Sequence, residues 1–108
     1  MSVLSYDQSA LVLFFKGLAN ETRLQILESL SQQSMTVSEM STSLGFEQSR
    51  VSHNLSCLEF CGFVTSRRDG KKKIYTLNGE TVAPLLAIAD GHIKQHGRNL
   101  LQCKVLKR

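Results

Sequence analysis

A chain of 108 residues can build one domain around a single core but not two independent domains, and an apolar fraction of 42% with a single proline excludes a disordered or proline-rich chain. No apolar run approaches the roughly 18 residues that cross a bilayer, and Met1 to Gln8 lacks the pattern of a signal peptide, so we expect a cytoplasmic protein without a membrane partner. The net charge of +4 is uneven: residues 61–108 carry ten Lys and Arg against three Asp and Glu, which favours either a nucleic-acid partner or a solvated basic loop.

Two helices are predicted before the middle of the chain. From Tyr6 to Leu18 the apolar residues recur mainly at helical spacing, which predicts the first helix. Asn20 is a good N-cap for a second helix, because its side-chain oxygen can accept a hydrogen bond from the first turn. The apolar stripe of that second helix begins at Leu24 and stops in the polar run 31–34.

The next two helices form a predicted helix-turn-helix. Thr36 followed three residues later by Glu39 is a capping-box pattern that opens a third helix, and Gly45 ends it. A fourth helix starts close to Gln48 and runs to Gly62, with an apolar stripe at i, i+4 and i+7. Two helices joined by a tight, glycine-containing turn are typical of the helix-turn-helix, whose second helix enters the major groove of DNA.

The pattern changes from helical to β after Gly62. Two β-prone runs flank Asp69 and Gly70, and an Asp-Gly pair in this place predicts a hairpin, because such a turn needs positive φ. With the helices, this hairpin predicts a mainly α fold with a β-hairpin wing, the winged helix-turn-helix. The cations that flank the hairpin tip, where they can lie along a duplex backbone, are Arg67, Arg68, Lys71, Lys72 and Lys73.

A long terminal helix is predicted after the hairpin. Residues 80–101 carry a wide apolar stripe, and Pro84 falls in the first turn, where a helix tolerates proline. The rest of a single domain over residues 1–108 cannot cover both this helix and the first one, so we expect helices 6–18 and 80–101 to pair across a two-fold axis. A homodimer with about five helices per protomer would place its recognition helices on an inverted repeat, one helical turn or a multiple of it apart.

Several stretches resemble a known family. The stretch from Leu18 to Leu27, LANETRLQIL, is similar to the second-helix opening of the ArsR/SmtB metalloregulators. Residues 48–55 and 62–64 resemble the recognition helix of that family and the entry to its wing, and residues 70–77 resemble the return strand of the wing. The resemblance implies a DNA-binding transcriptional repressor rather than an enzyme.

The resemblance also implies which residues contact double-stranded DNA. The polar residues of the fourth helix would face the major groove, and Arg50 would reach a phosphate or a guanine edge. Many members of the family have a histidine directly before the leucine that stands here at Leu55, whereas this chain has Asn54 there and His53 one place earlier, which leaves the base preference open. The predicted DNA contacts are Gln48, Ser49, Arg50, Ser52, His53 and Asn54 of the helix, and Arg67, Arg68, Lys71, Lys72 and Lys73 of the wing.

Three cysteines are the candidate sensor. Cys57 and Cys61 are four residues apart on the fourth helix, so their Cβ atoms should lie roughly 5 to 6 Å apart on one face, which suits one soft metal ion. Cys103, at the end of the last helix, can supply a third thiolate from the same or the partner subunit. The placement of the cysteines resembles that of cadmium and lead sensors of the family, which implies cadmium, lead or arsenite as an inducer that folding does not require.

Three alternatives are open for these thiols. They can pack as small apolar residues, since Cys61 lies close to the apolar stripe of its helix. They can form a disulfide or persulfide switch, for which Cys103 is a better partner than a helical i, i+4 neighbour. A thiol enzyme would use Cys57 or Cys61 with His53, but no acid that could orient the histidine and no oxyanion-type glycine turn accompany the pair.

If the three cysteines are a metal sensor, the protein is predicted to be a repressor with two linked states. The metal-free dimer would bind its operator and block transcription, and an ion at Cys57, Cys61 and Cys103 would favour a conformation with lower affinity for DNA. Because two of the ligands lie on the recognition helix, the coupling would act over a short distance. A loss of roughly 1 to 3 kcal/mol of binding free energy is enough for such a response.

Overall fold

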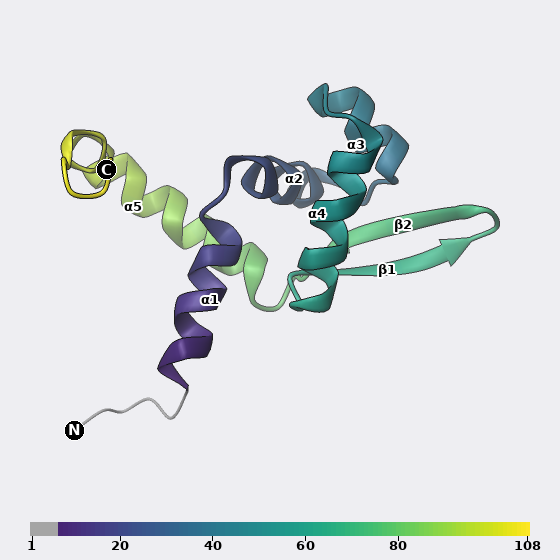
Figure 1. Ribbon diagram of the computed structural model, residues 1–108, viewed down its shortest axis with the longest axis horizontal. Coiled ribbons are helices and arrows are strands. Elements are labelled where there is room, and N and C mark those ends of the chain that lie inside the picture. Colours follow the sequence, from purple (N-terminus) through teal and green to yellow (C-terminus); the bar gives the residue numbers. More distant parts are fainter. Residues whose placement is uncertain (1–6) are drawn as a thin grey trace. The chain divides into compact units, whose positions relative to one another are not determined.

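The computed structural model describes residues 7–108, and its elements follow the predicted order (Figure 1). The winged helix-turn-helix is confirmed, with five helices and one two-stranded antiparallel sheet within these residues. No helix in this part of the chain is long and apolar enough to cross a membrane. The elements are α1 (Gln8–Leu18), α2 (Glu21–Gln32), α3 (Val37–Leu44), α4 (Gln48–Phe60), β1 (Val64–Asp69), β2 (Lys72–Leu77) and α5 (Val82–Gln102).

The chain divides into two compact units, one that ends at Leu77 and one that starts at Asn78. The first unit contains α1 to α4 and the wing, which is the hairpin of β1 and β2. The second unit contains α5 and the C-terminal tail. The prediction of a single domain over residues 1–108 stays a prediction.

Side-chain caps set the first turns of α1 and α2. Asp7 accepts a hydrogen bond from the backbone N–H of Ser9 (2.8 Å) at the start of α1, and the predicted first residue of this helix, Tyr6, lies outside the described residues. Asn20 caps α2 as predicted, because its side-chain oxygen accepts from the backbone N–H of Arg23 (3.0 Å). Each cap satisfies a backbone donor that a helix leaves unpaired, which stabilises the fold by about 1 kcal/mol.

Arg23 closes the short turn between α1 and α2. Its Nε donates to the carbonyl of Gly17 (2.6 Å) and its Nη2 donates to the carbonyl of Lys16 (2.9 Å). The last carbonyls of a helix lack partners within the helix and carry the negative end of its dipole, so a guanidinium is favourable there. Arg23 therefore holds the C-terminal end of α1 against the first turn of α2.

The boundaries of α3 follow from its sequence. The hydroxyl of Thr36 accepts from the backbone N–H of Glu39 (3.2 Å), and the carboxylate of Glu39 accepts from the backbone N–H of Thr36 (2.8 Å), so both halves of the predicted capping box form. Gly45 ends the helix with a φ of 73°, and its N–H donates to the carbonyl of Ser41 (2.9 Å). Two residues then lead into α4, which completes the predicted helix-turn-helix.

A second left-handed glycine ends α4. Gly62 has a φ of 84°, and its N–H donates to the carbonyl of Glu59 (3.1 Å). The next N–H, of Phe63, donates to the carbonyl of Leu58 (2.9 Å). These two bonds form a Schellman motif, which turns the chain sharply at the end of a helix. The turn directs the ring of Phe63 into the core, where it is 3% exposed.

The wing is a hairpin with a two-residue loop. Its register places Asp69 opposite Lys72, so the loop consists of Gly70 and Lys71. The predicted loop of Asp69 and Gly70 is therefore wrong by one residue. Gly70 has a φ of 65° and occupies the first loop position, as a type II′ turn requires, and this turn matches the twist of paired strands.

The core of the first unit joins the helices to the wing. The predicted stripe of α4 is confirmed, because Val51, Leu55 and Leu58 are 0% exposed. In α2 the buried face runs through Thr22, Ile26 and Leu30 at a spacing of four, so the predicted Leu24 lies at its edge and is only half-buried. The largest fully buried side chains of this unit are Ile26, Leu27, Met40, Val51, Leu55, Leu58 and Val64.

Gly17 lets α1 lie against the ring of Phe63. A Cβ at this position would come within 2.6 Å of Cε2 of Phe63. Although alanine favours a helix by about 1 kcal/mol, Gly17→Ala is expected to lower the free energy of unfolding by about 1 to 3 kcal/mol, because the ring and the helix must move apart. Urea unfolding at a fixed protomer concentration measures the change. In a Phe63→Leu chain the same substitution should cost little, and an equal cost there would exclude this contact as the cause.

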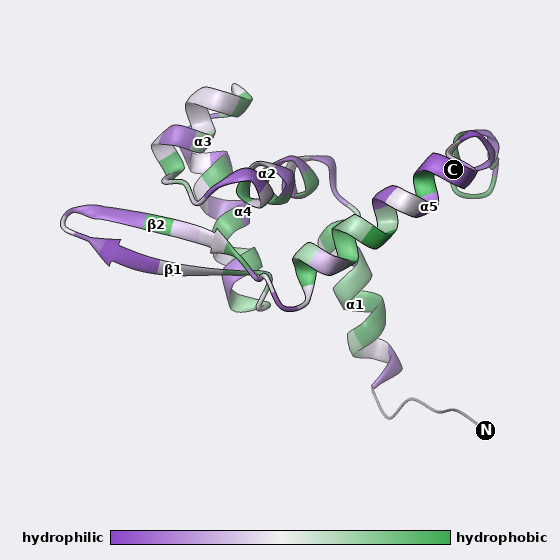
Figure 2. Ribbon diagram, turned by 180° about the vertical axis from the view of Figure 1, so that it is seen from behind, coloured by the Kyte–Doolittle hydropathy of each residue, from purple (hydrophilic) through white to green (hydrophobic). Residues whose placement is uncertain are grey.

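The second unit consists of α5 and a short tail. The side-chain oxygen of Asn78 accepts from two backbone N–H groups just before the helix (3.0 and 3.2 Å), and Pro84 lies in the first turn, as predicted. The helix starts two residues later and ends one residue later than the predicted range 80–101. Figure 2 shows hydrophobic residues at several positions along α5. Large apolar side chains that are exposed on it are Ile88 (70%), Ile93 (55%) and Leu101 (72%).

Candidate nucleic-acid interface and thiol site

The polar face of α4 lies opposite its buried stripe. The stripe holds α4 against the rest of the first unit, and the side chains between the buried positions point away from the core. Because α4 is the second helix of the helix-turn-helix, this polar face is the surface that a major groove can receive. The predicted DNA contacts that are exposed on α4 are Gln48, Ser49, Arg50, Ser52 and His53.

Arg50 and Asn54 form hydrogen bonds within the protein. Nη2 of Arg50 donates to the hydroxyl of Thr22 on α2, and Cζ of the guanidinium lies 4.0 Å from the centre of the Phe46 ring. Asn54 donates to the backbone carbonyl of Arg50, one turn back (2.9 Å). Arg50 therefore braces α4 against α2. Its guanidinium has five donors, so a contact with DNA is compatible with this bond and stays a prediction.

Thr22→Val tests this brace, because valine keeps the shape of threonine and removes the hydroxyl. Thr22 is 8% exposed, so water does not easily replace it as the partner of Arg50. We expect the free energy of unfolding to fall by about 1 kcal/mol and the affinity for DNA to fall with it. Urea unfolding and fluorescence anisotropy measure the two effects. Thr22→Ser keeps the acceptor and should retain DNA affinity, and an equal loss in both variants would contradict the role of the hydroxyl.

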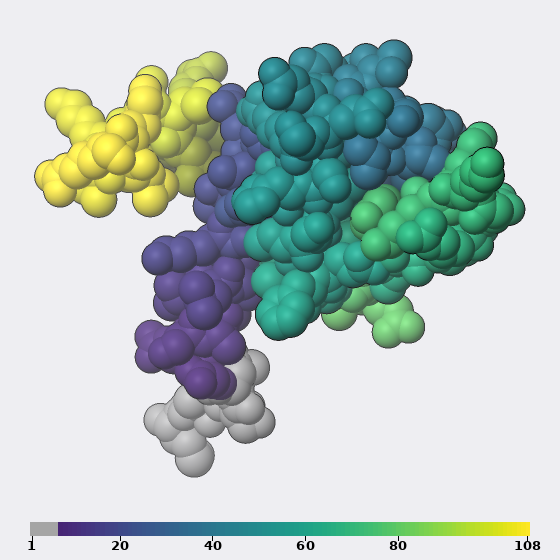
Figure 3. All heavy atoms as spheres, turned by 45° about the vertical axis from the view of Figure 1, so that its right-hand side comes forward, coloured from purple at the N-terminus to yellow at the C-terminus, as the bar shows by residue number. Residues whose placement is uncertain are grey.

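The tip of the wing gathers the predicted cations. Figure 2 shows hydrophilic residues along the outer part of the hairpin, and in Figure 3 the wing stands out at the edge of the first unit. Exposed cations on a protruding hairpin can approach a phosphate backbone without displacing other parts of the protein. The side chains of Arg67, Arg68, Lys71, Lys72 and Lys73 are all exposed.

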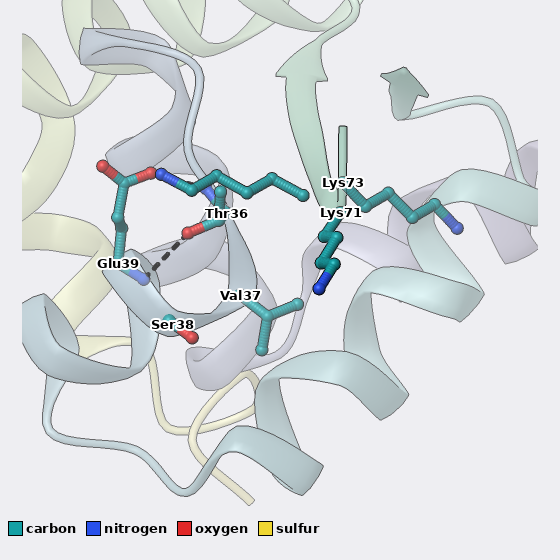
Figure 4. Close-up of a pocket in the computed structure, with 7 residues that line it drawn as sticks. Thr36, Val37, Ser38, Glu39, Lys71 and Lys73 are labelled. Carbon is teal, nitrogen blue, oxygen red and sulfur yellow. Dashed lines mark hydrogen bonds between the residues drawn. The ribbon is translucent and has the colours of Figure 1, made fainter. Parts of the chain in front are cut away.

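A hollow separates the wing tip from the start of α3 (Figure 4). Glu39 lies at its edge, and hydrogen bonds from the backbone and side chain of Thr36, together with nearby Lys72, hold the pKa of Glu39 below its usual range. Figure 4 shows Lys71 reaching toward Val37. The residues that line the hollow are Thr36, Val37, Ser38, Glu39, Lys71, Lys72 and Lys73.

Lys73 is paired with α4, which distinguishes it from the other cations of the tip. Its Nζ lies 3.6 Å from Oε1 of Glu59 and 5.3 Å from the centre of the Tyr75 ring. These two neighbours, with Tyr75 the stronger, raise the pKa of Lys73 above its usual range. Ser66 of β1 donates a hydrogen bond to the other carboxylate oxygen of Glu59. One acidic side chain of α4 therefore contacts both strands of the wing.

Cys57 and Cys61, which we call the thiol pair, are exposed at the end of α4. Neither fills the core of the first unit. Partial burial raises the pKa of Cys61, and the neighbouring Cys57 raises it further through charge and a hydrogen bond between the two side chains. The two side chains of the thiol pair therefore lie next to each other at the end of α4. Cys61 also borders an apolar hollow that is lined by Ala10, Leu13, Phe14 and Phe63.

Cys103 lies directly after α5, in the second unit, and is half-buried. Within residues 7–108 of one chain, no three side chains of His, Cys, Asp or Glu gather where they could hold a metal ion. The role of Cys103 as a third ligand therefore stays a prediction. On α5 itself, the ring centres of His92 and His96 lie 4.7 Å apart, and Asp90 pairs with Lys94 at 3.0 Å.

Comparison with known proteins identifies the family. Residues 20–66, from the cap of α2 to the first strand of the wing, match the family described as "Bacterial regulatory protein, arsR family". The crystal structure of Rv0081 from Mycobacterium tuberculosis has a TM-score of 0.79 at 33% identity and covers 90% of this chain and 99% of that one. The chain belongs to the ArsR family. It is therefore a helix-turn-helix transcriptional regulator and not an enzyme.

Two further relatives of this ArsR-family protein bear on its function. It is 43% identical over 76 residues to the protein named "Probable mercury resistance operon repressor" of Streptomyces lividans, an overlap of 70% of this chain and 61% of that protein. The chain thus spans less than two thirds of the Streptomyces protein. The solution structure of the homodimeric winged helix-turn-helix DNA-binding domain Mb0332 from Mycobacterium bovis has a TM-score of 0.76 at 34% identity and covers 92% of this chain and 95% of that one.

Sequence reasoning missed the residues that hold the interface in place. Arg23 and Thr22 stand in the LANETRLQIL stretch, but spacing alone does not reveal that one caps α1 and the other accepts from Arg50. Glu59 stands between the cysteines and carries no motif. The available signal was its charge, because a lone acid on a helix that precedes a basic hairpin is a natural partner for one of the hairpin cations.

Proposed function

We propose that this protein is a dimeric repressor that releases its operator when a thiophilic ion binds the thiol pair. The observation that carries the proposal is that Cys57 and Cys61 lie exposed and adjacent on the helix whose other end presents the polar face. One helix therefore bears both the DNA-reading residues and the candidate sensor. An ion that changes the position of one end of α4 also changes how the other end sits in a groove.

The DNA-binding part of the proposal rests on the polar face of α4 and the wing. The side chains of Gln48, Ser49, Ser52 and His53 would contact base edges, whereas the wing cations would contact phosphates and fix the register. Phosphate contacts make binding depend strongly on salt concentration. Arg50 and Asn54, which also form hydrogen bonds within the protein, complete the predicted set of DNA contacts.

Homodimer formation is supported by exposed apolar side chains on both terminal helices. On α1, Leu13 is 65% exposed and Phe15 is 51% exposed, and on α5 Ile88 and Leu101 are more than two-thirds exposed. Exposed apolar residues that recur along a helix favour an interface with another protein surface. The homodimeric Mb0332 domain has the same fold. A two-fold dimer of this kind would read an inverted-repeat operator.

The inducer in this proposal is an ion that prefers sulfur. Two thiolates of the pair, with Cys103 of the same or the partner subunit as a third, suit cadmium, lead or arsenite, whereas zinc usually takes a fourth ligand. The Streptomyces relative is named for mercury resistance, and mercury is also thiophilic. This relative supports an ion of that chemical class.

A redox switch is the second candidate function. It is favoured by a solved relative described as "Reduced HlyU from Vibrio cholerae N16961", which has a TM-score of 0.69 at 33% identity. In this chain an exposed thiol of the pair and Cys103 would form a disulfide by giving two electrons and two protons to an added oxidant, or the thiol would accept the outer sulfur of a small-molecule persulfide, which leaves as a thiol. Such a switch would lower DNA affinity on oxidation with no metal present, and a reductant would restore it.

One binding experiment separates these functions. A duplex selected from a random-sequence pool by the reduced, metal-free protein is titrated with protein by fluorescence anisotropy, first alone, then with CdCl2 under a reductant that does not bind metal, then after oxidation without metal. The proposal predicts selection of an inverted repeat and a loss of affinity of about 5- to 150-fold with cadmium only. Loss on oxidation only would establish the redox switch, and selection of no DNA would contradict both.

A further inference from the structure

Glu59 connects the thiol pair to the wing. It lies in the last turn of α4, between Cys57 and Cys61 in the sequence. Its carboxylate accepts a hydrogen bond from Ser66 of β1 and pairs with Lys73 of β2 at 3.6 Å. Among the residues that the structure describes, this is the ion pair that joins α4 to the wing. A single side chain therefore contacts both strands from the turn that carries both thiols.

The base of the wing is held more firmly than its tip. Tyr75, which carries the Lys73 ammonium over its ring, is 4% exposed and exchanges two backbone hydrogen bonds with Met35 (2.9 and 3.1 Å). Beyond Lys73 the hairpin continues only through exposed residues to its loop. A change at the contact between Glu59 and Lys73 would therefore alter the direction of the tip, which bears the other cations, more than that of the base.

We propose that Glu59 is a positioning residue that transmits the state of the thiol pair to the wing; this inference rests on the proposed function. When a divalent ion joins the sulfur atoms of Cys57 and Cys61, two S–H bonds break, two S–metal bonds form and two protons pass to solvent. The net charge of the pair is then unchanged. What changes is geometry, because two side chains one turn apart become fixed to one centre.

The helical turn between the two sulfur atoms holds the backbone of Glu59, so fixing the sulfur atoms shifts the carboxylate relative to Ser66 and Lys73. In the metal-free state the carboxylate holds the wing in the position that binds DNA. In the ion-bound state that contact is weakened, and the wing cations no longer meet the phosphates together. DNA and metal then oppose each other reciprocally, because each favours a different state of the same contact.

The test is Glu59→Gln, which keeps the size of the side chain and an oxygen that can accept from Ser66, but removes the ion pair with Lys73. The readout is the ratio of the DNA dissociation constants with and without CdCl2, measured with the selected duplex. Cadmium binding is followed separately by its thiolate absorption. We expect the variant to bind cadmium as the wild type does, while the ratio falls to below about threefold. In the metal-free variant the slope of log K against log salt concentration should become shallower than in the wild type, because the wing cations no longer meet the phosphates together.

Ser66→Ala removes the second contact of the carboxylate and should also reduce the ratio, which keeps the test decisive if Glu59→Gln folds poorly. Glu28→Gln, which neutralises an exposed carboxylate on α2, is the matched control and should leave both the ratio and the salt slope unchanged. A wild-type ratio in both Glu59→Gln and Ser66→Ala would overturn the inference. Absence of cadmium binding or of any cadmium effect on DNA binding in the wild type would instead overturn the proposed function.

Discussion

Replacing Lys71, Lys72 and Lys73 together with alanine is expected to weaken DNA binding strongly and to flatten its dependence on salt. Each lysine that neutralises a phosphate contributes about 0.9 to the slope of log K against log salt concentration. Three equal contacts would lower the slope by about 2.7. Because Lys73 is paired with Glu59, we expect a decrease closer to about 1.8, from Lys71 and Lys72 alone. Anisotropy titrations of the selected duplex between about 50 and 200 mM salt measure this slope.

The control for the wing variant removes the same charge from the second unit. Lys94, Lys104 and Lys107 lie on α5 and the tail, and replacing them with alanine changes the net charge by the same amount. If the wing acts through phosphate contacts, this control should retain most of the affinity and the slope. Equal losses in both triple variants would mean that only the overall charge matters, and unchanged binding in the wing variant would remove the wing from the interface.

The local signals in the sequence predicted most of the helix boundaries. Asn20, the capping box of Thr36 and Glu39, and the left-handed glycines at 45 and 62 act through bonds between near neighbours in the chain, so their spacing contains the needed information. The hairpin loop was misplaced by one residue because Asp-Gly suits more than one turn type. The pairing of β1 with β2 decides which turn type forms, and this pairing involves residues that are further apart in the chain.

The contacts that position the candidate site are long-range and were not predicted. Arg50 bonds to Thr22 on another helix, and Glu59 bonds to two strands that follow it. Nothing in the spacing of these residues distinguishes them from exposed polar residues, because their partners depend on how the helices pack. Sequence reasoning therefore did not predict the bond between Arg50 and Thr22 and gave Glu59 no role. The thiol pair could be predicted because its two members share one helix.

Cys57→Ser and Cys61→Ser are each expected to lower cadmium affinity by about a hundredfold or more. A structural site with four ligands binds zinc with roughly 10 to 16 kcal/mol, so one thiolate contributes on the order of 3 kcal/mol, or about a factor of one hundred. The wild type, reduced and metal-free, should show thiolate-to-metal absorption that saturates at about one ion per protomer. Each serine variant should show weaker absorption with no sharp end point, and cadmium should no longer release DNA.

Two further measurements distinguish a metal site from a packing role of the thiols. They are the cadmium affinity of Cys103→Ser and the free energy of unfolding of all three serine variants. A third thiolate at Cys103 predicts a similar loss of cadmium affinity, whereas a site of two thiolates predicts no change. Because Cys57 and Cys61 are exposed, their serine variants should unfold with nearly the wild-type free energy, while a packing role would lower it by about 1 kcal/mol or more. Normal stability with lost cadmium binding supports a sensor. Normal stability with unchanged, weak and nonstoichiometric binding in every variant excludes the metal site and leaves redox chemistry as the function of the thiols.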